Sequence, residues 1–379
     1  MEHVWYTWVV CLFYLAAGRP VQSRYRRCQA PSHTIAVSLN GFCMSPHVCR
    51  RLSNCTTYYG NLIFRTSAGN VTDRNQRVRP HFPHLREITG YLMIGLFNQD
   101  RFTILPALTV IRGHRLLGNY ALIIYYCTEL KEINFSSLTT ILHGGVRIEK
   151  NNNLCYVDGV KWSSIVRDKF QGEQFGVVVR QDNPNCDTGC YSDRCKVVAG
   201  HGDDPNAQHC WGPGGNGTDY QCQKFCNSKC GLQGCVEGST QKCCGPECLG
   251  GCMDMSNVTS WSGTPCYACR HYRIEQTGQC VEKCPSYLYL VSNLTCERSC
   301  PASQYSLGGT CVESCPSGYK EKGRRCVKCV LAIDGPCPKI CYLQHERIEG
   351  VFYNGSVIRL PKDIERKGNL TNHFSRSEY

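Results

Sequence analysis

Cysteine is the residue whose chemistry dominates this sequence. The chain has 31 cysteines in 379 residues, and 24 of them lie in the segment from Cys186 to Cys341. Thiols persist at that density only when they bind metal or are oxidised to disulfides, and disulfides form in oxidising compartments. The cysteine content therefore predicts an extracellular protein that is held together by cross-links.

Two cysteine pairs have the spacing of zinc ligands. Cys266 and Cys269, like Cys326 and Cys329, are separated by two residues, which is the spacing found in many structural zinc sites. In a secreted chain with this many cysteines, disulfides are strongly favoured over metal. We therefore predict no metal and no other cofactor.

The sequence contains no motif that predicts an enzyme. Residues 212–217 fit G-x-G-x-x-G, but they lie between two cysteines, without the preceding strand and following helix that a phosphate site needs. The histidines are dispersed, and the zinc-protease, nucleophile-elbow and P-loop patterns are missing from the sequence. Trp162 and Trp211, near Cys155 and Cys210, are candidate binding residues, although an indole packed on a disulfide is the commoner role.

The N-terminal residues 1–23 predict a secretory signal peptide. Residues 9–18 form an apolar core, and Val21-Gln22-Ser23 supplies small residues for cleavage. No later run reaches the roughly 18 apolar residues of a membrane span, so we expect a secreted protein. Eight Asn-x-Ser/Thr sequons suggest a glycosylated, exposed surface. The predicted glycosylation sites are Asn54, Asn70, Asn134, Asn216, Asn257, Asn293, Asn354 and Asn369.

The formal net charge of the chain is +12. The excess is scattered, with small clusters at residues 24–27 and 320–325. This pattern is compatible with weak binding to acidic glycans, and solubility explains it equally well. No nucleic-acid partner is predicted.

Residues 28–185 contain only six cysteines and have the aliphatic content of a domain with a conventional core. Short apolar segments recur there at a period near 30, which is typical of stacked coils with one strand per repeat. The segments are residues 60–64, 90–94, 120–124, 145–149 and 176–180. We therefore predict a mainly β solenoid with a parallel sheet.

Side chains alternate between the two faces of such a sheet. The inward set predicts a core made of Leu62, Phe64, Leu92, Ile94, Leu122, Ile124, Val146 and Ile148. The outward set is apolar with charge at its margin, which is typical of a surface that binds a protein partner. Its predicted ligand-binding residues are Ile63, Arg65, Tyr91, Met93, Tyr120, Ile123, Tyr125 and Arg147. The alternative is that a loop or the second domain covers this surface.

From Cys186 onward, Gly, Ser, Asn and Cys replace the aliphatic runs, and disulfides must substitute for a large core. Three C-x3-C-P modules begin at Cys280, Cys296 and Cys311. The loop from the second cysteine of each to the next cysteine suits one bridge per loop and predicts a rod of small single-bridge units. The three bridges expected are Cys284–Cys296, Cys300–Cys311 and Cys315–Cys326.

Several ordered motifs resemble one family. They are VRIEKNNNLCYVDGVKW (residues 146–162), CWGPGG (210–215), CCGPECLGGC (243–252), CYACRHY (266–272) and GPCPKIC (335–341). The match resembles the insulin-receptor class of receptor tyrosine kinases over residues 28–341. It implies a first leucine-rich L domain, folded as a right-handed parallel β-helix, followed by a furin-like cysteine-rich region.

The resemblance also implies a disulfide order. It pairs Cys28–Cys55, Cys155–Cys186, Cys190–Cys210, Cys195–Cys222, Cys226–Cys235, Cys230–Cys243, Cys244–Cys252, Cys248–Cys266, Cys269–Cys280 and Cys329–Cys337. Cys43 and Cys49 are close enough in sequence for a further local bridge. Cys127 and Cys341 then remain unpaired: the first as a buried thiol, the second as a candidate link to another chain in a homodimer.

Two departures concern the ligand surface of the family. Aromatic residues on the first sheet contact the hormone in this family, and Gly95 and Gly118 stand at matching positions here, whereas Tyr120 is retained. The loop from Cys300 to Cys311 is too short to hold the insert that helps to bind ligand in the insulin-receptor class.

The sequence therefore predicts a signal peptide at 1–23, an L domain at 24–185, a cysteine-rich domain at 186–341, and at 342–379 the start of a second L domain or a disordered tail. The predicted function is a secreted, kinase-less decoy that sequesters an insulin-like or growth-factor-like peptide. One alternative is a partial product of a receptor gene, with cell-surface binding and signalling in the full-length receptor. A second alternative is a structural extracellular glycoprotein.

Overall fold

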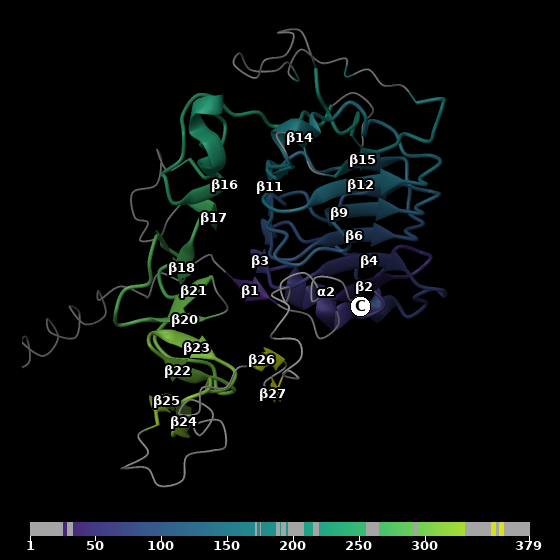
Figure 1. Ribbon diagram of the computed structural model, residues 1–379. Helices are drawn as coiled ribbons and strands as arrows, with labels where there is room; N and C mark the ends of the chain where they lie inside the picture. The colour runs from purple at the N-terminus through teal and green to yellow at the C-terminus, as the bar shows by residue number, and fades with distance from the viewer. Residues whose placement is uncertain are drawn as a thin grey trace, which may run out of the picture. The chain divides into compact units, whose positions relative to one another are not determined.

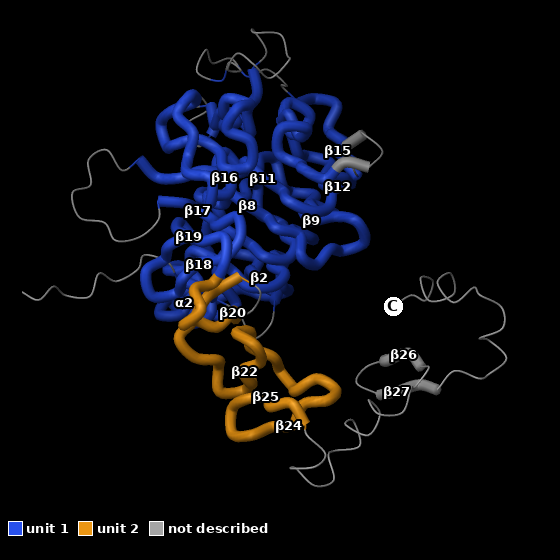
Figure 2. Tube along the Cα trace, turned by 60° about the vertical axis from the view of Figure 1, so that its left-hand side comes forward, with its two compact units in different colours: residues 1–283 blue, residues 284–379 orange. Residues whose placement is uncertain are grey.

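A computed structural model gives the structure of the chain (Figure 1). The described residues are 26–28, 33–170, 173–174, 176–186, 190, 195, 208–214, 220–254, 265–291, 294–329, 350–353 and 356–359. The chain divides into two compact units, Met1–Lys283 and Cys284–Tyr379 (Figure 2). The proposed signal peptide lies outside the described residues. Among the described residues, no helix has the length and apolar character needed to cross a membrane.

Six strands of the first unit form its larger sheet, in the order β15-β12-β9-β6-β4-β2. The strands are β2 (Thr34–Val37), β4 (Leu62–Thr66), β6 (Leu92–Gly95), β9 (Tyr120–Tyr125), β12 (Gly145–Glu149) and β15 (Val177–Val179). All neighbouring strands are parallel, and Leu62, Leu92, Leu122 and Val146 align across four of them. The predicted strand positions and their period near 30 are therefore those of the structure.

A second parallel sheet has the order β1-β3-β5-β8-β11, and β7 pairs with β10 in a third. These strands are β1 (Arg27–Cys28), β3 (Thr57–Tyr58), β5 (Glu87–Ile88), β7 (Arg101–Phe102), β8 (Val110–Ile111), β10 (Glu132–Ile133) and β11 (Thr140–Ile141). The expectation of one strand per repeat was wrong. Each added strand is only two residues long, too short for alternation to be visible in the sequence.

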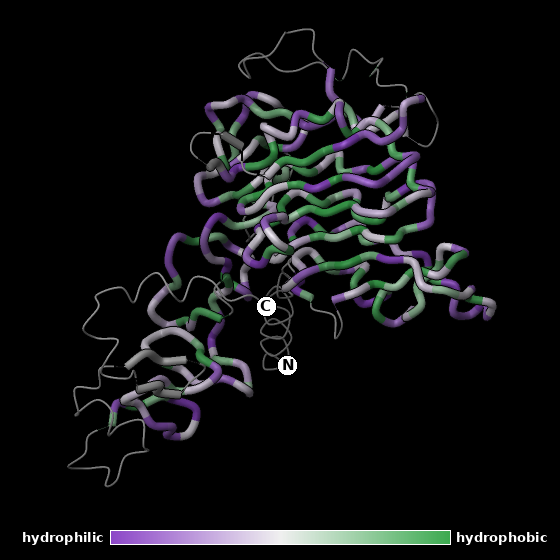
Figure 3. Tube along the Cα trace, turned by 45° about the vertical axis from the view of Figure 1, so that its right-hand side comes forward, coloured by the Kyte–Doolittle hydropathy of each residue, from purple (hydrophilic) through white to green (hydrophobic). Residues whose placement is uncertain are grey.

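The core of the first unit lies between these sheets. All eight inward residues predicted for the larger sheet are fully buried, and Figure 3 shows stretches of the hydrophobic colour along the stacked strands. Phe102 contacts both Phe64 and Phe135 with ring centroids 5.2 and 5.7 Å apart. Trp211, from the cysteine-rich segment, continues this aromatic row by packing edge-on against Phe135 and Trp162. The two tryptophans are thus core residues.

Short elements close the ends of the first unit. They are the helix α2 (Pro46–Leu52), the 3-10 turns η1 (Arg74–Gln76) and η2 (Trp162–Ser164), and the antiparallel pair β13 (Lys169–Phe170) and β14 (Glu173–Gln174). Pro46 suits the first turn of α2, where its missing N–H costs nothing. The buried residues of α2, Cys49 and Leu52, attach it to the core.

The first part of the cysteine-rich segment belongs to the same compact unit as the sheets. It contains η4 (Ser228–Gln233), the antiparallel pair β16 (Cys248–Cys252) and β17 (Cys266–Cys269), and the antiparallel pair β18 (Tyr272–Ile274) and β19 (Cys280–Val281). Buried Leu249 and Ala268 pack against Val110 of β8. The hydroxyl of Thr139 also donates to the Gly250 carbonyl at 2.7 Å. These contacts join the cysteine-rich segment to the smaller sheet.

The second unit repeats a two-stranded module. Its strands are β20 (Tyr289–Val291), β21 (Thr295–Glu297), β22 (Tyr305–Leu307), β23 (Thr310–Val312), β24 (Tyr319–Lys322) and β25 (Arg325–Lys328). Consecutive strands pair in antiparallel fashion, and parallel contacts join one module to the next. In the predicted tail, β26 (Gly350–Tyr353) and β27 (Ser356–Arg359) pair in antiparallel fashion.

Thirteen disulfides join described cysteines, and each joins a pair expected from the sequence. Of the fourteenth expected pair, Cys329 is described and Cys337 lies outside the described residues. Cys341 also lies outside them. Cys127 is a buried free thiol, and burial raises its pKa to about 11, so it is protonated at neutral pH and behaves as a small apolar side chain.

Candidate ligand-binding face

The sequence-predicted ligand residues lie together on one side of the larger sheet. We call this side the outer face, defined by Ile63, Arg65, Tyr91, Met93, Tyr120, Ile123, Tyr125 and Arg147. The parallel register places Ile63, Met93, Ile123 and Arg147 in one row across β4, β6, β9 and β12. The sheet therefore brings residues from four successive repeats onto one surface.

The members of the outer face differ in exposure. Arg65 is exposed, and Ile63, Tyr91, Met93, Tyr120, Tyr125 and Arg147 are half-buried. Ile123 is only 4% exposed, because it lies in the middle of the row between Met93 and Arg147. It supports its neighbours and presents almost no contact area, so its expected role as a direct ligand contact does not fit the structure.

Gly95 leaves the outer face without a side chain at a position where the resemblance implied an aromatic residue. A Cβ added to Gly95 would lie 2.9 Å from the terminal methyl of Met93, closer than real side chains approach. Met93 therefore lies over the position that a larger side chain would occupy. The flexible thioether of methionine adapts to a partner more readily than a rigid ring does. Gly118, the other departure, has a positive φ of 60° and nothing near it.

A cluster of cations and tyrosines forms one margin of the outer face. The Arg147 guanidinium lies 5.6 Å from the Tyr120 ring centroid and 5.5 Å from that of Tyr125. It also hydrogen-bonds the Glu149 carboxylate, which raises the pKa of Arg147 above its usual value. The pairing orients the guanidinium between the two rings, in the range of cation–π contacts.

Three residues at this margin were not predicted from the sequence. Leu96, Tyr126 and Lys150 follow β6, β9 and β12, and each has a positive φ, of 50°, 56° and 59°. Leu96 is 65% exposed and Tyr126 46% exposed. Lys150 lies 5.0 Å from the Tyr126 ring centroid, and its hydrogen bonds to Tyr125 and Tyr126 raise its pKa. The sequence signal that could have identified these three residues is their equivalent position, directly after the strand, in successive repeats.

The chemistry of this face is that of recognition. An apolar strip bordered by tyrosines and cations suits an interface with a protein, where aromatic residues and arginine contribute most of the binding free energy. Among the eight residues that define this face, none is a serine, cysteine, threonine or lysine paired with a base, which is the arrangement of nucleophilic catalysis.

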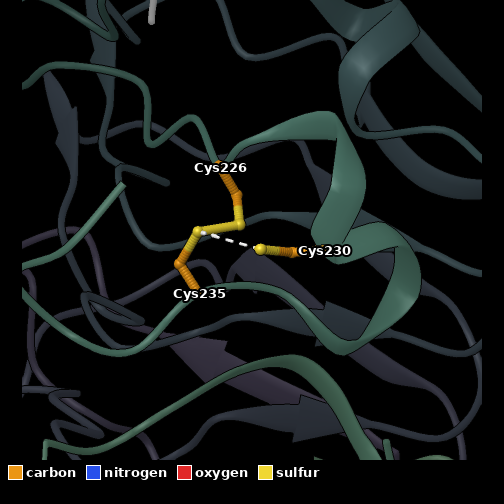
Figure 4. A group of neighbouring side chains, drawn as sticks. All are labelled: Cys226, Cys230 and Cys235. Atoms are coloured by element: carbon orange, nitrogen blue, oxygen red, sulfur yellow. Dashed lines mark hydrogen bonds between the residues drawn. A yellow bond between two sulfur atoms is a disulfide. The ribbon is translucent and has the colours of Figure 1, made fainter. Parts of the chain in front are cut away.

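Two groups of cysteine sulfurs have the compactness of metal sites. They are Cys226 with Cys230 and Cys235, and Cys244 with Cys248 and Cys252. Figure 4 shows the first group, in which Cys226 and Cys235 are bonded to each other and Cys230 approaches at 4.0 Å. All six sulfurs belong to disulfides, and a metal ligand must be a thiolate. The grouping results from neighbouring bridges.

The glycine-rich stretch that begins at Gly212 packs against the Glu132 side chain. The amide of Gly214 donates to the Glu132 carboxylate at 3.0 Å, and a Cβ at Gly212 would lie 2.8 Å from Glu132. Burial raises the pKa of Glu132. The loop therefore holds a side chain from the L domain, within the same compact unit, and residues 215–217 lie outside the described residues.

Three of the eight sequons can be placed. Asn54 and Asn70 are exposed, whereas Asn134 is half-buried and its side chain accepts a hydrogen bond from the Ser136 amide at 3.1 Å. The other five asparagines lie outside the described residues: Asn216, Asn257, Asn293, Asn354 and Asn369.

Two family models match the chain. The receptor L domain matches residues 54–166, and the furin-like cysteine rich region matches residues 180–342. These segments carry no kinase domain, so no enzymatic activity is assigned to them.

Curated relatives match over most of the chain. The putative insulin-like peptide receptor of Hydra vulgaris is 43% identical over 90% of this chain, and the insulin-like growth factor 1 receptor of Xenopus laevis is 36% identical over 85%. The insulin-like receptor of Caenorhabditis elegans is 30% identical over 85%. The matches span 23%, 23% and 19% of the relatives' own lengths, so the chain corresponds to about a fifth to a quarter of these proteins.

Proposed function

Because the chain belongs to the insulin-receptor class through its receptor L domain and furin-like cysteine-rich region, we propose that it binds an insulin-like peptide on the outer face of its larger sheet. The observation that carries this proposal is the in-register row of Ile63, Met93 and Arg147, flanked by half-buried tyrosines. The relative from Hydra vulgaris is named as a putative receptor of such a peptide.

The fold supports this use of the sheet. Parallel strands that align at steps of 30, 30 and 24 residues agree with a right-handed parallel β-helix. In such a coil the sheet is held by the core and by the repeats on either side of it. A face built on strands keeps its contact residues in fixed positions, which reduces the entropy lost on binding.

We further propose that the chain works outside the cell. Thirteen disulfides stabilise the described part of the chain, and such bridges form and persist in oxidising compartments. The proposed signal peptide and the exposed sequons at Asn54 and Asn70 agree with secretion.

When these 379 residues act alone, the proposed effect is to remove free peptide. Their matched segments supply the proposed binding face and carry no kinase domain, so the free ligand concentration is the quantity that they would change. The alternative is that the same face serves ligand binding within a longer receptor, and proteomic identification of native peptides beyond Tyr379 would favour it. A structural glycoprotein remains a third candidate, which requires no peptide binding.

The experiment adds the purified chain to cells that bear an intact insulin-like peptide receptor. The account predicts that receptor phosphorylation falls in proportion to the peptide bound, and that extra peptide restores it. Activation without added peptide, or inhibition that excess peptide does not relieve, would contradict the proposal that the chain acts by removing free peptide. A chain that captures no insulin-like peptide would favour the structural glycoprotein.

A further inference from the structure

A cavity lies where the cysteine-rich segment packs against the smaller sheet. Its volume is about 710 Å³, and its lining comes from β11 and η2 on one side and from residues 222–240 with Gly250 and Tyr267 on the other. Both sides belong to the first compact unit, and Figure 2 shows β11 and β16 side by side there. The outer face contributes no residue to this lining.

Hydrogen bonds hold the two sides of the cavity in place. Gln223, which is 4% exposed, accepts from the Lys161 amide at 2.8 Å and donates to the Ser164 hydroxyl at 2.9 Å. At another point, Thr139 donates to the Gly250 carbonyl at 2.7 Å. The cavity is therefore preformed, as small-molecule sites usually are.

The lining is positively charged. Among its residues Lys161, Arg167 and Lys224 are cations and Glu237 is the single carboxylate, which leaves a net charge of +2. Burial lowers the pKa of Arg167, and no carboxylate offsets that effect among the described residues. A cation in such a place favours an anionic ligand, because an opposite charge would offset its desolvation.

Polar groups in the lining lack partners. The Nε of Arg167 and the hydroxyl of Thr140 are buried and have no hydrogen-bond partner among the described residues, although Nη2 of Arg167 donates to the Thr139 carbonyl at 3.3 Å. Lys224, exposed at the cavity, lies 3.5 Å from the Ser137 hydroxyl. Unpaired buried polar groups are costly, and a ligand that satisfies them gains that free energy.

We infer that this cavity binds a sugar that carries an oxyanion ester, sulfate or phosphate, with Arg167 and Lys224 holding the anion. The volume falls within the roughly 300–1,000 Å³ of small-molecule pockets, which is far more than a bare anion fills. The hydroxyls of Ser137, Thr140 and Ser163 suit a polyhydroxylated body. The inference is independent of peptide binding, since the cavity and the outer face share no residue.

The test is isothermal titration of the purified chain with glucosamine 6-sulfate and with glucose 6-phosphate. Glucosamine, inorganic sulfate and inorganic phosphate are the reference probes. At least one ester should bind more tightly than all three, and the one that does identifies the ester class. Equal binding of glucosamine would overturn the anion site, equal binding of an inorganic anion would overturn the sugar, and failure of both esters to bind would overturn the whole inference.

Variants locate the site. Lys224→Gln should weaken the ester by roughly tenfold, since hydrogen bonds to charged groups are worth that factor, whereas Lys242→Gln, an exposed lysine of the same segment outside the lining, should leave it unchanged. Arg167→Lys keeps the charge and should bind more tightly than Arg167→Gln, with thermal unfolding used to confirm that both variants fold. Equal losses at Lys224 and Lys242 would contradict the assigned cavity.

Discussion

The buried ion pair of Glu87 and Arg112 should control how firmly the cysteine-rich segment is attached to the L domain. Both side chains are 4% exposed. The Arg112 guanidinium pairs with Glu87 and also donates to the carbonyl of Cys269, while Glu87 accepts from the Thr57 hydroxyl at 3.1 Å. One cation therefore joins two strands of the smaller sheet to β17.

Arg112→Met should be strongly destabilising. It leaves the Glu87 carboxylate buried with only the Thr57 hydroxyl as a partner among the described contacts, and breaking a buried pair costs about 3–5 kcal/mol. In a domain of roughly 150–250 residues, 1 kcal/mol shifts Tm by about 2–4 °C. The expected fall in Tm is thus about 6–20 °C.

The double variant Glu87→Leu/Arg112→Met tests the cause. It removes both charges, and well-packed apolar residues often replace a buried pair at little cost, so it should recover much of the lost Tm. Calorimetry with the disulfides intact measures all three proteins, and Arg270→Met, at an exposed arginine beside Cys269, is the matched control. A fall below about 2 °C in Arg112→Met, or a double variant less stable than Arg112→Met, would refute the reasoning.

Three further predictions concern other parts of the chain. Trp211→Ala should cost about 3–5 kcal/mol, because its indole is 1% exposed and packs on Phe135; an unchanged Tm would contradict its place in the core. The Cys127 thiol, with a pKa raised to about 11 by burial, should resist iodoacetamide in the folded protein at pH 8 and react after unfolding without reductant, and peptide mapping reports both. Burial raises this pKa from 9.0 to about 11, so the stability that the protonated thiol contributes to the fold is complete below the unfolded value of 9.0. That contribution should be lost as the pH rises from there through the folded value. Glycopeptide analysis should find a fuller glycan at exposed Asn70 than at half-buried Asn134, and the reverse order would contradict the burial argument.

Much of the fold was readable because its signals are periodic. Inward residues such as Leu62 and Leu92 repeat at the step that the parallel register needs, and one bridge closes the loop that follows each C-x3-C-P motif, as in Cys300–Cys311. A repeating pattern in the sequence predicts the structural elements that repeat with it, here the strands of the larger sheet and the disulfide-closed loops. It also placed most of the outer face, because alternation assigns a side to every strand residue.

The remainder depends on contacts between distant parts of the sequence. No local pattern shows that Trp211 completes the aromatic core or that Glu132 occupies the glycine-rich loop, since each contact joins segments about 80 residues apart. Ile123 is outward in register yet 4% exposed, because its exposure depends on the side chains around it. The division of the compact units at Cys284, within the cysteine-rich region, likewise reflects packing.

The most direct test of the central claim is equilibrium binding of a labelled insulin-like peptide to the purified chain and to the double variant Tyr91→Ala/Met93→Ala. These residues lie on the outer face and outside the inward core, so folding should be little changed. The account predicts saturable binding that weakens roughly 5- to 150-fold, or about 1–3 kcal/mol. Tyr287→Ala, a 73% exposed tyrosine outside that face, should bind as the unmodified chain does. Equal affinity of the double variant and the unmodified chain, or no binding by either, would contradict the account.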